Sequence, residues 1–186
     1  DTEEQLKPEI GSLGMIVADM KQFHSLPETI AIGMAYTAQA QGDIQATIHY
    51  SRQILELVPE EDSCRREQAY MMLGMTYWAT GDLEAAERIF ADHTLRLRKT
   101  GNIPDAISTT VVLADIRMTL GHLQLAIDST KELIQFTLDQ DGSTISDAAD
   151  LHRELADLCL EQWDLEAAAQ HLQKSKELGE KTNHPV

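Results

Sequence analysis

The sequence predicts an all-α protein built from about four tandem pairs of antiparallel helices. Two observations carry this prediction. A short motif recurs at a nearly constant spacing along the 186 residues, and the composition favours helix, with only 10 Gly, 5 Pro and 5% aromatic residues. A fixed period of roughly 40 residues is typical of stacked helical repeats. We therefore expect a solenoid in which each pair packs on its neighbours.

The recurring motif is a turn followed by an amphipathic run. Its four copies begin at Gly42, Gly81, Gly121 and Trp163, which lie 39, 40 and 42 residues apart. Gly can end a helix in the left-handed conformation, and the next residue, which is Asp in three copies, can cap the following helix. Two helices joined by so short a turn run antiparallel. Trp163 replaces the expected Gly, so the fourth turn is either wound differently or strained.

Helix starts divide the chain further. Ser25-Leu26-Pro27-Glu28 reads as a capping box with Pro in the first turn, and Asn102-Ile103-Pro104 and Asp141-Gly142-Ser143 mark two later starts. The expected helix pairs are 27–41 with 44–57, 64–80 with 83–99, 104–120 with 123–139, and 145–162 with 165–180. Residues 6–22 predict one more helix, the second half of a preceding pair.

These elements predict a single repeat domain over residues 1–186, with helix-pair repeats at 27–57, 64–99, 104–139 and 145–180. The chain opens at Asp1 without Met, so we expect a fragment of a larger protein. No stretch approaches the ~20 apolar residues needed to span a bilayer, and no secretory signal is seen. The sequence therefore predicts a cytoplasmic protein without a membrane partner.

Charge and cysteine usage limit the partners. The formal net charge is −16, which would repel a phosphate backbone, so we expect no direct contact with nucleic acid by this chain. The plainer interpretation is that the charge keeps a helical surface soluble. Cys64 and Cys159 have no paired metal spacing and are expected to be free thiols in a reducing compartment, with a disulfide as the alternative.

The second repeat resembles the tetratricopeptide (TPR) consensus, and the other repeats keep parts of it over residues 27–181. The matching positions are Tyr70, Leu73-Gly74, Tyr77, Gly81-Asp82, Ala86 and Phe90. The resemblance implies a right-handed superhelical solenoid whose concave groove is lined by the first helix of each pair. It also implies binding rather than catalysis.

The long period points to a subgroup. Leu57-Val58-Pro59-Glu60-Glu61, Gly101-Asn102 and the Trp163–Ala168 run resemble the sensor region of MalT-like bacterial regulators. These are ATP-dependent transcription activators with a LuxR-type helix-turn-helix. The resemblance implies an inducer-receiving region. The sequence contains neither a GxxxxGK[ST] phosphate loop nor a basic recognition helix, so the nucleotide-binding and DNA-binding parts are expected outside this fragment.

The TPR frame places candidate ligand-binding residues on the groove face of the first helices. They are Tyr36, Gln39, Gln68, Met71, Met75, Trp78, Asp115, Met118 and Arg153. Aromatic rings could stack on a sugar or peptide side chain, and the polar groups could hydrogen-bond it. Met at helical spacing is also common in a core, and a helix of a second copy could fill the groove instead.

No catalytic or metal-binding residues are predicted, and no cofactor. The seven His form neither HxxxH nor HExxH, and Glu60-Glu61-Asp62 reads as a solvated turn. The leading hypothesis is a domain that senses a small effector, including an oligosaccharide. The alternatives are a scaffold that binds a peptide or protein partner, with an acidic fourth repeat suited to a basic peptide, and a domain that mediates oligomerisation.

Overall fold

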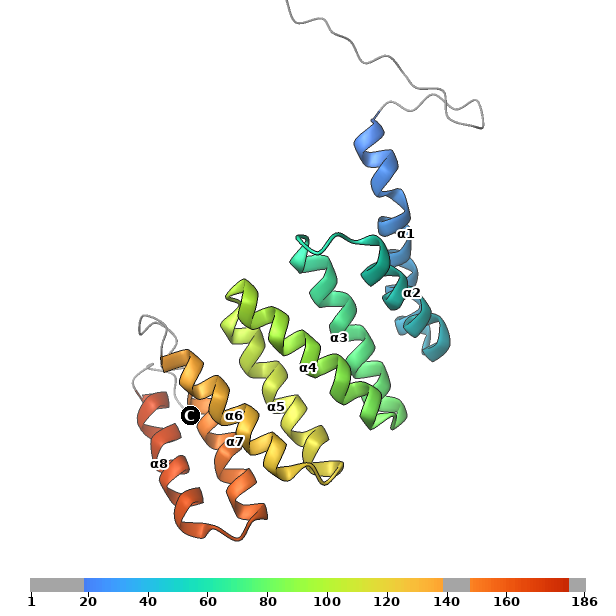
Figure 1. Cartoon of the computed structure of the whole chain (residues 1–186). Coiled ribbons are helices and arrows are strands. Elements are labelled where there is room, and N and C mark those ends of the chain that lie inside the picture. Colours follow the sequence, from blue (N-terminus) through green and yellow to red (C-terminus); the bar gives the residue numbers. More distant parts are fainter. Residues whose placement is uncertain (1–18, 139–147, 181–186) are drawn as a thin grey trace, which may run out of the picture. The chain divides into compact units, whose positions relative to one another are not determined.

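The computed structural model describes residues 19–138 and 148–180, and within these ranges the chain forms eight α-helices and no strand (Figure 1). This confirms the all-α prediction. The helices are α1 (Met20–Gln41), α2 (Ile44–Leu57), α3 (Ser63–Thr80), α4 (Leu83–Thr100), α5 (Ile103–Thr119), α6 (Leu123–Leu138), α7 (Ala148–Glu161) and α8 (Leu165–Glu180). The chain divides into two compact units, residues 1–69 and 70–186. Each is described by itself.

In the first unit, α1 and α2 pack together through small side chains. The buried face of α1 carries Ala31, Ala35 and Ala38, and α2 contributes Thr47, Ser51 and Ile54. Spacings of three and four residues put each set on one helix face. Alanine lets the two backbones approach closely. The prediction of a helix pair here is therefore confirmed.

The predicted start of the first helix was wrong. The helix begins at Met20, where the Asp19 carboxylate accepts a hydrogen bond of 3.0 Å from the Gln22 N–H, and Pro27 lies inside the helix. The Ser25 hydroxyl does not cap, because it donates to the carbonyl of Gln22 at 3.0 Å. Asp19 is an equally good cap by residue type. The proposed helix at 6–22 lies mostly outside the described residues, and its last residues belong to α1.

The repeated turns have the predicted geometry. Gly42, Gly81 and Gly121 adopt φ of 72°, 81° and 79°, in the left-handed region. In three turns, an Asp at the next position caps the following helix, because its carboxylate accepts a hydrogen bond from a backbone N–H three residues later. Asp43 accepts from Ala46 at 3.0 Å, Asp82 from Ala85 at 3.1 Å and Asp164 from Ala167 at 3.0 Å.

The backbone angle of Trp163 shows whether the fourth turn is wound differently or is strained. Its φ is 60°, so it takes the same left-handed conformation as the glycines, but with a Cβ. A non-Gly residue in this region is disfavoured by roughly 1–2 kcal/mol. The turn is therefore wound like the others and is strained.

In the second unit, α4 to α8 pack in chain order, each on the next (Figure 1). The hydrophobic core combines residues of α4, α5, α6 and α7, with Leu97, Ala114, Leu133, Leu151 and Leu155 among its buried members. The expected helix starts near 104, 123 and 165 agree with α5, α6 and α8 within the usual margin. The predicted turn at 141–143 and the first residues of the 145–162 helix lie outside the described residues.

Candidate functional site

The part of α3 that belongs to the second unit presents an exposed apolar surface. Met71, Met75 and Trp78 follow one another on α3 at spacings of four and three residues, so they share one face of the helix. They are 39%, 40% and 37% exposed. These three side chains therefore lie on the surface, where a ligand can reach them, and do not fill the core.

The predicted residues of α5 and α7 are more varied. Asp115 is exposed, and Arg153 is exposed with its Nη1 atom 3.6 Å from Oδ2 of Asp157. Met118 is half-buried and packs against the core of the unit, so much of its surface is already covered. The surface thus changes from apolar on α3 to charged on α5 and α7.

Sequence reasoning missed Glu154, which lies beside this charged surface. It is 3% exposed, and its Oε1 atom has no hydrogen-bond partner among the described residues. Burial raises the pKa of Glu154 to about 7, and the negative charge of Asp115 adds to the rise. A buried carboxyl with a pKa near neutrality is a common feature of functional sites.

A signal for Glu154 was present when the repeats are aligned on one another. The last three repeats have a Leu at one position of their first helix: Leu73, Leu113 and Leu155. The residue before this Leu is apolar in two of these repeats, Met72 and Val112, and is Glu154 in the last. A charged residue at a position that the other repeats fill with apolar side chains is expensive unless it is paired or protonated. The exception marks Glu154 as the residue to examine.

The remaining predicted residues belong to the first unit. Tyr36 is 47% exposed, and Gln39, three residues later on α1, is exposed on the same side of the helix. Gln68 is exposed on α3. These residues are open to solvent, and their role in binding stays a prediction.

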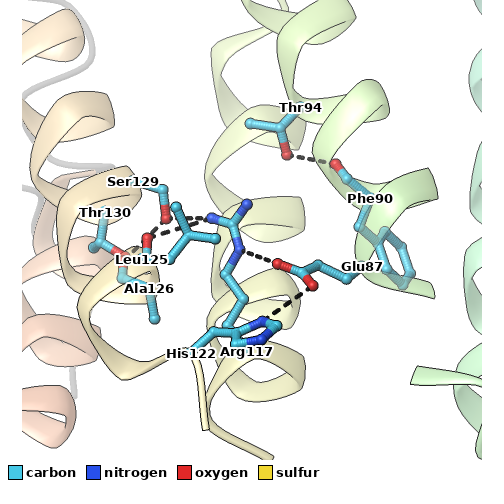
Figure 2. A network of polar contacts seen from close by, with 9 residues as sticks. All are labelled: Glu87, Phe90, Thr94, Arg117, His122, Leu125, Ala126, Ser129 and Thr130. Atoms are coloured by element: carbon cyan, nitrogen blue, oxygen red, sulfur yellow. Dashed lines mark hydrogen bonds and ion pairs between the residues drawn. The ribbon is translucent and has the colours of Figure 1, made fainter. Parts of the chain in front are cut away.

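A second polar arrangement lies between α4, α5 and α6 (Figure 2). The guanidinium of Arg117 donates to Glu87 at 3.0 Å and to the hydroxyl of Ser129 at 2.8 Å. The other oxygen of Glu87 lies 3.3 Å from Nδ1 of His122. The Arg117 side chain is 9% exposed, and its partners come from both neighbouring helices, so this network fastens three helices together.

A cavity of about 220 Å³ lies beside this network, lined by residues of α4, α5 and α6. Leu95 and Leu125 line it together with Arg98, which pairs with Glu132 at 2.9 Å. Because Arg98 and Arg117 are both paired with carboxylates, their charges are already satisfied within the protein. The cavity therefore offers a ligand weaker charge recognition than the surface around Glu154.

The histidines form no metal centre in the part of the chain that the structure describes, where no three His, Cys, Asp or Glu side chains are grouped to hold an ion. His152 and His171 face each other with 3.0 Å between their Nδ1 atoms. Burial lowers the pKa of both. Cys64 is exposed, Cys159 is buried, and both are free. No helix of the described residues is long and apolar enough to cross a membrane.

The sequence matches the family model of the MalT-like TPR region over residues 28–186. The chain belongs to this family. The match reaches all four helix pairs and confirms the resemblance seen in the second repeat. No curated protein matches the sequence.

Solved structures confirm the TPR-like solenoid fold. A structure of nearly identical TPR-like repeats, described as those of a kinesin light chain from Podosopora anserina, has a TM-score of 0.66 at 18% identity, covering 85% of this chain and 77% of that one. BtubC (BKLC) from P. vanneervenii has a TM-score of 0.66 at 13% identity, covering 88% and 68%. MamA has 0.58 at 15% identity, covering 88% and 85%. At these identities the likeness establishes the fold alone.

Proposed function

We propose that this chain is the partner-receiving repeat domain of a MalT-like, LuxR-family transcription regulator. Its ligand would bind on the face of α3, α5 and α7 that carries Met71, Met75, Trp78 and Asp115, here called the first-helix face. The exposed row of Met71, Met75 and Trp78 is the observation that supports this assignment. Large apolar side chains on a monomer's surface often mark a site of interaction.

The chemistry of the first-helix face favours a peptide or a segment of a protein. Flexible Met side chains adapt to varied apolar groups, and Trp78 adds a rigid contact area. The carboxylates of Asp115 and Asp157 then favour basic side chains on the same ligand. Domains of this repeat type are generally non-catalytic scaffolds, which agrees with a role in binding.

A small effector, including an oligosaccharide, is the second candidate. The 37% exposure of Trp78 leaves part of its ring free to stack on a sugar, and membership of the MalT-like family supports a sensing role. Salt separates the two candidates. A basic peptide should bind more weakly as ionic strength rises, whereas a neutral sugar should show little change.

The test is thermal unfolding of the protein with oligosaccharides, nucleotides and short peptides. A ligand at 100 times its Kd stabilises the folded state by about 2.7 kcal/mol, or roughly 5–11 °C for a chain of this size. Trp78→Ala should remove the shift, and Leu95→Ala, which changes an exposed side chain on α4, should keep it. A shift that survives Trp78→Ala would place the ligand elsewhere. Concentration-dependent mass without ligand would indicate oligomerisation instead.

A further inference from the structure

We infer that the cavity between α4, α5 and α6 binds a small uncharged molecule with a branched apolar body and one carbonyl oxygen. The oxygen accepts a hydrogen bond from Arg117, and the apolar body lies against leucine side chains. This is a binding site in addition to the first-helix face, and the inference does not depend on the proposed function.

The walls of the cavity favour an apolar ligand of small size. Leu113 and Leu133 line it and are 2% and 1% exposed, whereas Leu95 and Leu125 line it and are about half exposed. The cavity therefore runs from the surface to buried leucines. Its volume of about 220 Å³ is below the roughly 300–1,000 Å³ of pockets that hold drug-sized ligands, so a smaller molecule fits.

Arg117 places a free hydrogen-bond donor at this cavity. Its Nε atom donates to Glu87 at 3.0 Å and its Nη1 atom to Ser129 at 2.8 Å, but among the described residues no acceptor for its Nη2 atom is found. Figure 2 shows Nη2 pointing away from Glu87, on the side of the network where Thr94 lies. Thr94 and Arg117 both line the cavity.

The burial of Arg117 makes this donor valuable to a ligand. The side chain is 9% exposed, so few water molecules can reach its nitrogens, and a donor left without an acceptor in such a place is costly. An oxygen atom of a bound molecule would remove this cost. Hydrogen bonds from a charged donor are also stronger than those between neutral groups.

The charges that line the cavity favour an uncharged ligand. Arg98 pairs with Glu132 at 2.9 Å and Arg117 with Glu87 at 3.0 Å, whereas Asp128 has no cationic partner among the described residues. An anion would therefore meet the carboxylate of Asp128, and a cation would meet the two guanidinium groups. A carbonyl oxygen satisfies the free donor without adding a charge that must be desolvated.

The cavity and the first-helix face lie on different sides of α5. Asp115 belongs to the first-helix face and lies two residues from both Leu113 and Arg117, which line the cavity. Two residues correspond to about 200° around an α-helix. A molecule in the cavity would therefore leave the first-helix face open to its own ligand.

The experiment is an NMR titration of the whole protein, labelled in its leucine methyl groups, with methyl isobutyl ketone. We expect the methyl signals of Leu113 and Leu133 to shift with a Kd on the order of 1 mM, as is reasonable for so small a ligand. The guanidinium signals of Arg117 should shift in the same titration, because its Nη2 atom gains an acceptor.

Two matched probes test the chemistry of the ligand. Isobutyl methyl sulfide replaces the carbonyl by sulfur, which is a weak acceptor, and should bind about 10-fold more weakly without shifting the guanidinium signals of Arg117. Isocaproate keeps the branched body but carries a negative charge, and should bind several-fold more weakly than the ketone.

A variant that fills the cavity tests its location. Ala91 lines the cavity from α4, so Ala91→Leu should remove the shifts caused by the ketone. Ala79→Leu adds the same side chain at an exposed position of α3 and should keep them. Circular dichroism would show that both variants fold. If Ala91→Leu does not fold, the three probes on the unaltered protein decide alone.

Each contrary result overturns the inference. No shift of the cavity methyl groups with the ketone would show that the cavity does not bind this class of molecule. Equal binding of ketone and sulfide would show that Arg117 does not hold the oxygen, and tighter binding of isocaproate would show that the site prefers an anion. Binding that survives in a folded Ala91→Leu variant would place the ketone elsewhere.

Discussion

Gly74 on α3 lies directly against the ring of Phe90 on α4. A Cβ added to Gly74 would stand 2.6 Å from the ring atom Cζ, which is well inside van der Waals contact. Phe90 is completely buried. The two residues thus form a close packing point between the helices of one pair, and only a residue without a side chain fits at position 74.

Replacing Gly74 by Ala should destabilise the protein by about 1–3 kcal/mol. Ala is normally better than Gly inside a helix by about 1 kcal/mol, but here the methyl group must displace a buried ring. Urea unfolding monitored by circular dichroism measures the change. A stabilised variant would show that α3 and α4 are farther apart than the structure has them.

Gly33 offers the matched control. It also lies inside a helix, α1, and a Cβ added there would meet no other atom within 4 Å. Gly33→Ala should therefore stabilise the protein by up to about 1 kcal/mol. Opposite signs for the two substitutions would separate the packing effect from helix propensity.

Trp163→Gly should stabilise the protein, although it removes the largest side chain in the turn. Trp163 is 86% exposed and has φ of 60°, so the substitution loses little buried area and relieves left-handed strain. Greater freedom of Gly in the unfolded chain offsets part of the gain, which leaves about 0.5–1 kcal/mol. Differential scanning calorimetry would detect the higher Tm, and Gly121→Ala should lower it.

Much of the fold was predictable because its signals are local. The left-handed turn at Gly81 and the cap at Asp82 depend on residues adjacent in sequence. The start of α1 was missed for the same reason, since two nearby cap signals, Asp19 and Ser25, compete and the sequence does not rank them. Trp163 showed that an anomaly existed, but only the backbone angle showed that the turn is strained.

The candidate site was less predictable because it depends on contacts between helices. The repeat frame, which comes from the resemblance to the TPR consensus, placed Met71, Met75 and Trp78 on an exposed face of the helix, and their role in binding stays a prediction. It did not identify Glu154, whose burial and raised pKa come from α7 packing beside α5. Met118 shows the same limit, because its position on the helix does not reveal that it packs on the core.

Removing the charge of Arg117 should be strongly destabilising. Arg117→Met leaves the partly buried Glu87, whose side chain is 16% exposed, with His122 as its remaining ion-pair partner among the described residues, and breaking a buried pair costs roughly 3–5 kcal/mol. Urea unfolding of Arg117→Met, Glu87→Met and the double variant would form a double-mutant cycle. The double variant should recover part of the loss. Arg98→Met, at a pair whose Glu132 is 65% exposed, should lose only about 1 kcal/mol.

His93 should make the protein sensitive to acid. The ring stacks on Tyr70 with 5.5 Å between centroids, and both of its nitrogens are buried without a hydrogen-bond partner among the described residues. Burial lowers the pKa of His93 to about 4, against the opposing effect of Asp105. The unfolded chain binds this proton below about pH 6.5, so the contribution of His93 to stability is lost as pH falls from 6.5 to 4, by roughly 3 kcal/mol. In urea unfolding, the free energy of unfolding of His93→Leu should therefore rise relative to that of wild type as pH falls over this range.

Glu154 should have the opposite effect. Its pKa is raised from 4.5 to about 7, so the folded state holds a proton that the unfolded chain has released. This contribution is fully present below pH 4.5 and is lost as pH rises through 7, again by roughly 3 kcal/mol. Glu154→Gln should therefore be more stable relative to wild type at pH 8 than at pH 4.5. Asp128→Asn, which changes an exposed carboxylate on α6, should show no such trend.

The two contributions overlap between about pH 4.5 and 6.5, where they cancel in the wild-type protein because one falls as the other rises. Both groups can therefore titrate while the free energy of unfolding of the wild-type protein stays constant across this pH window. The single variants should tilt the profile in opposite directions: His93→Leu makes stability fall as pH rises, and Glu154→Gln makes it rise. The double variant should be flat again, and urea unfolding across this window would show it. Parallel profiles for both single variants would contradict the burial of the two groups.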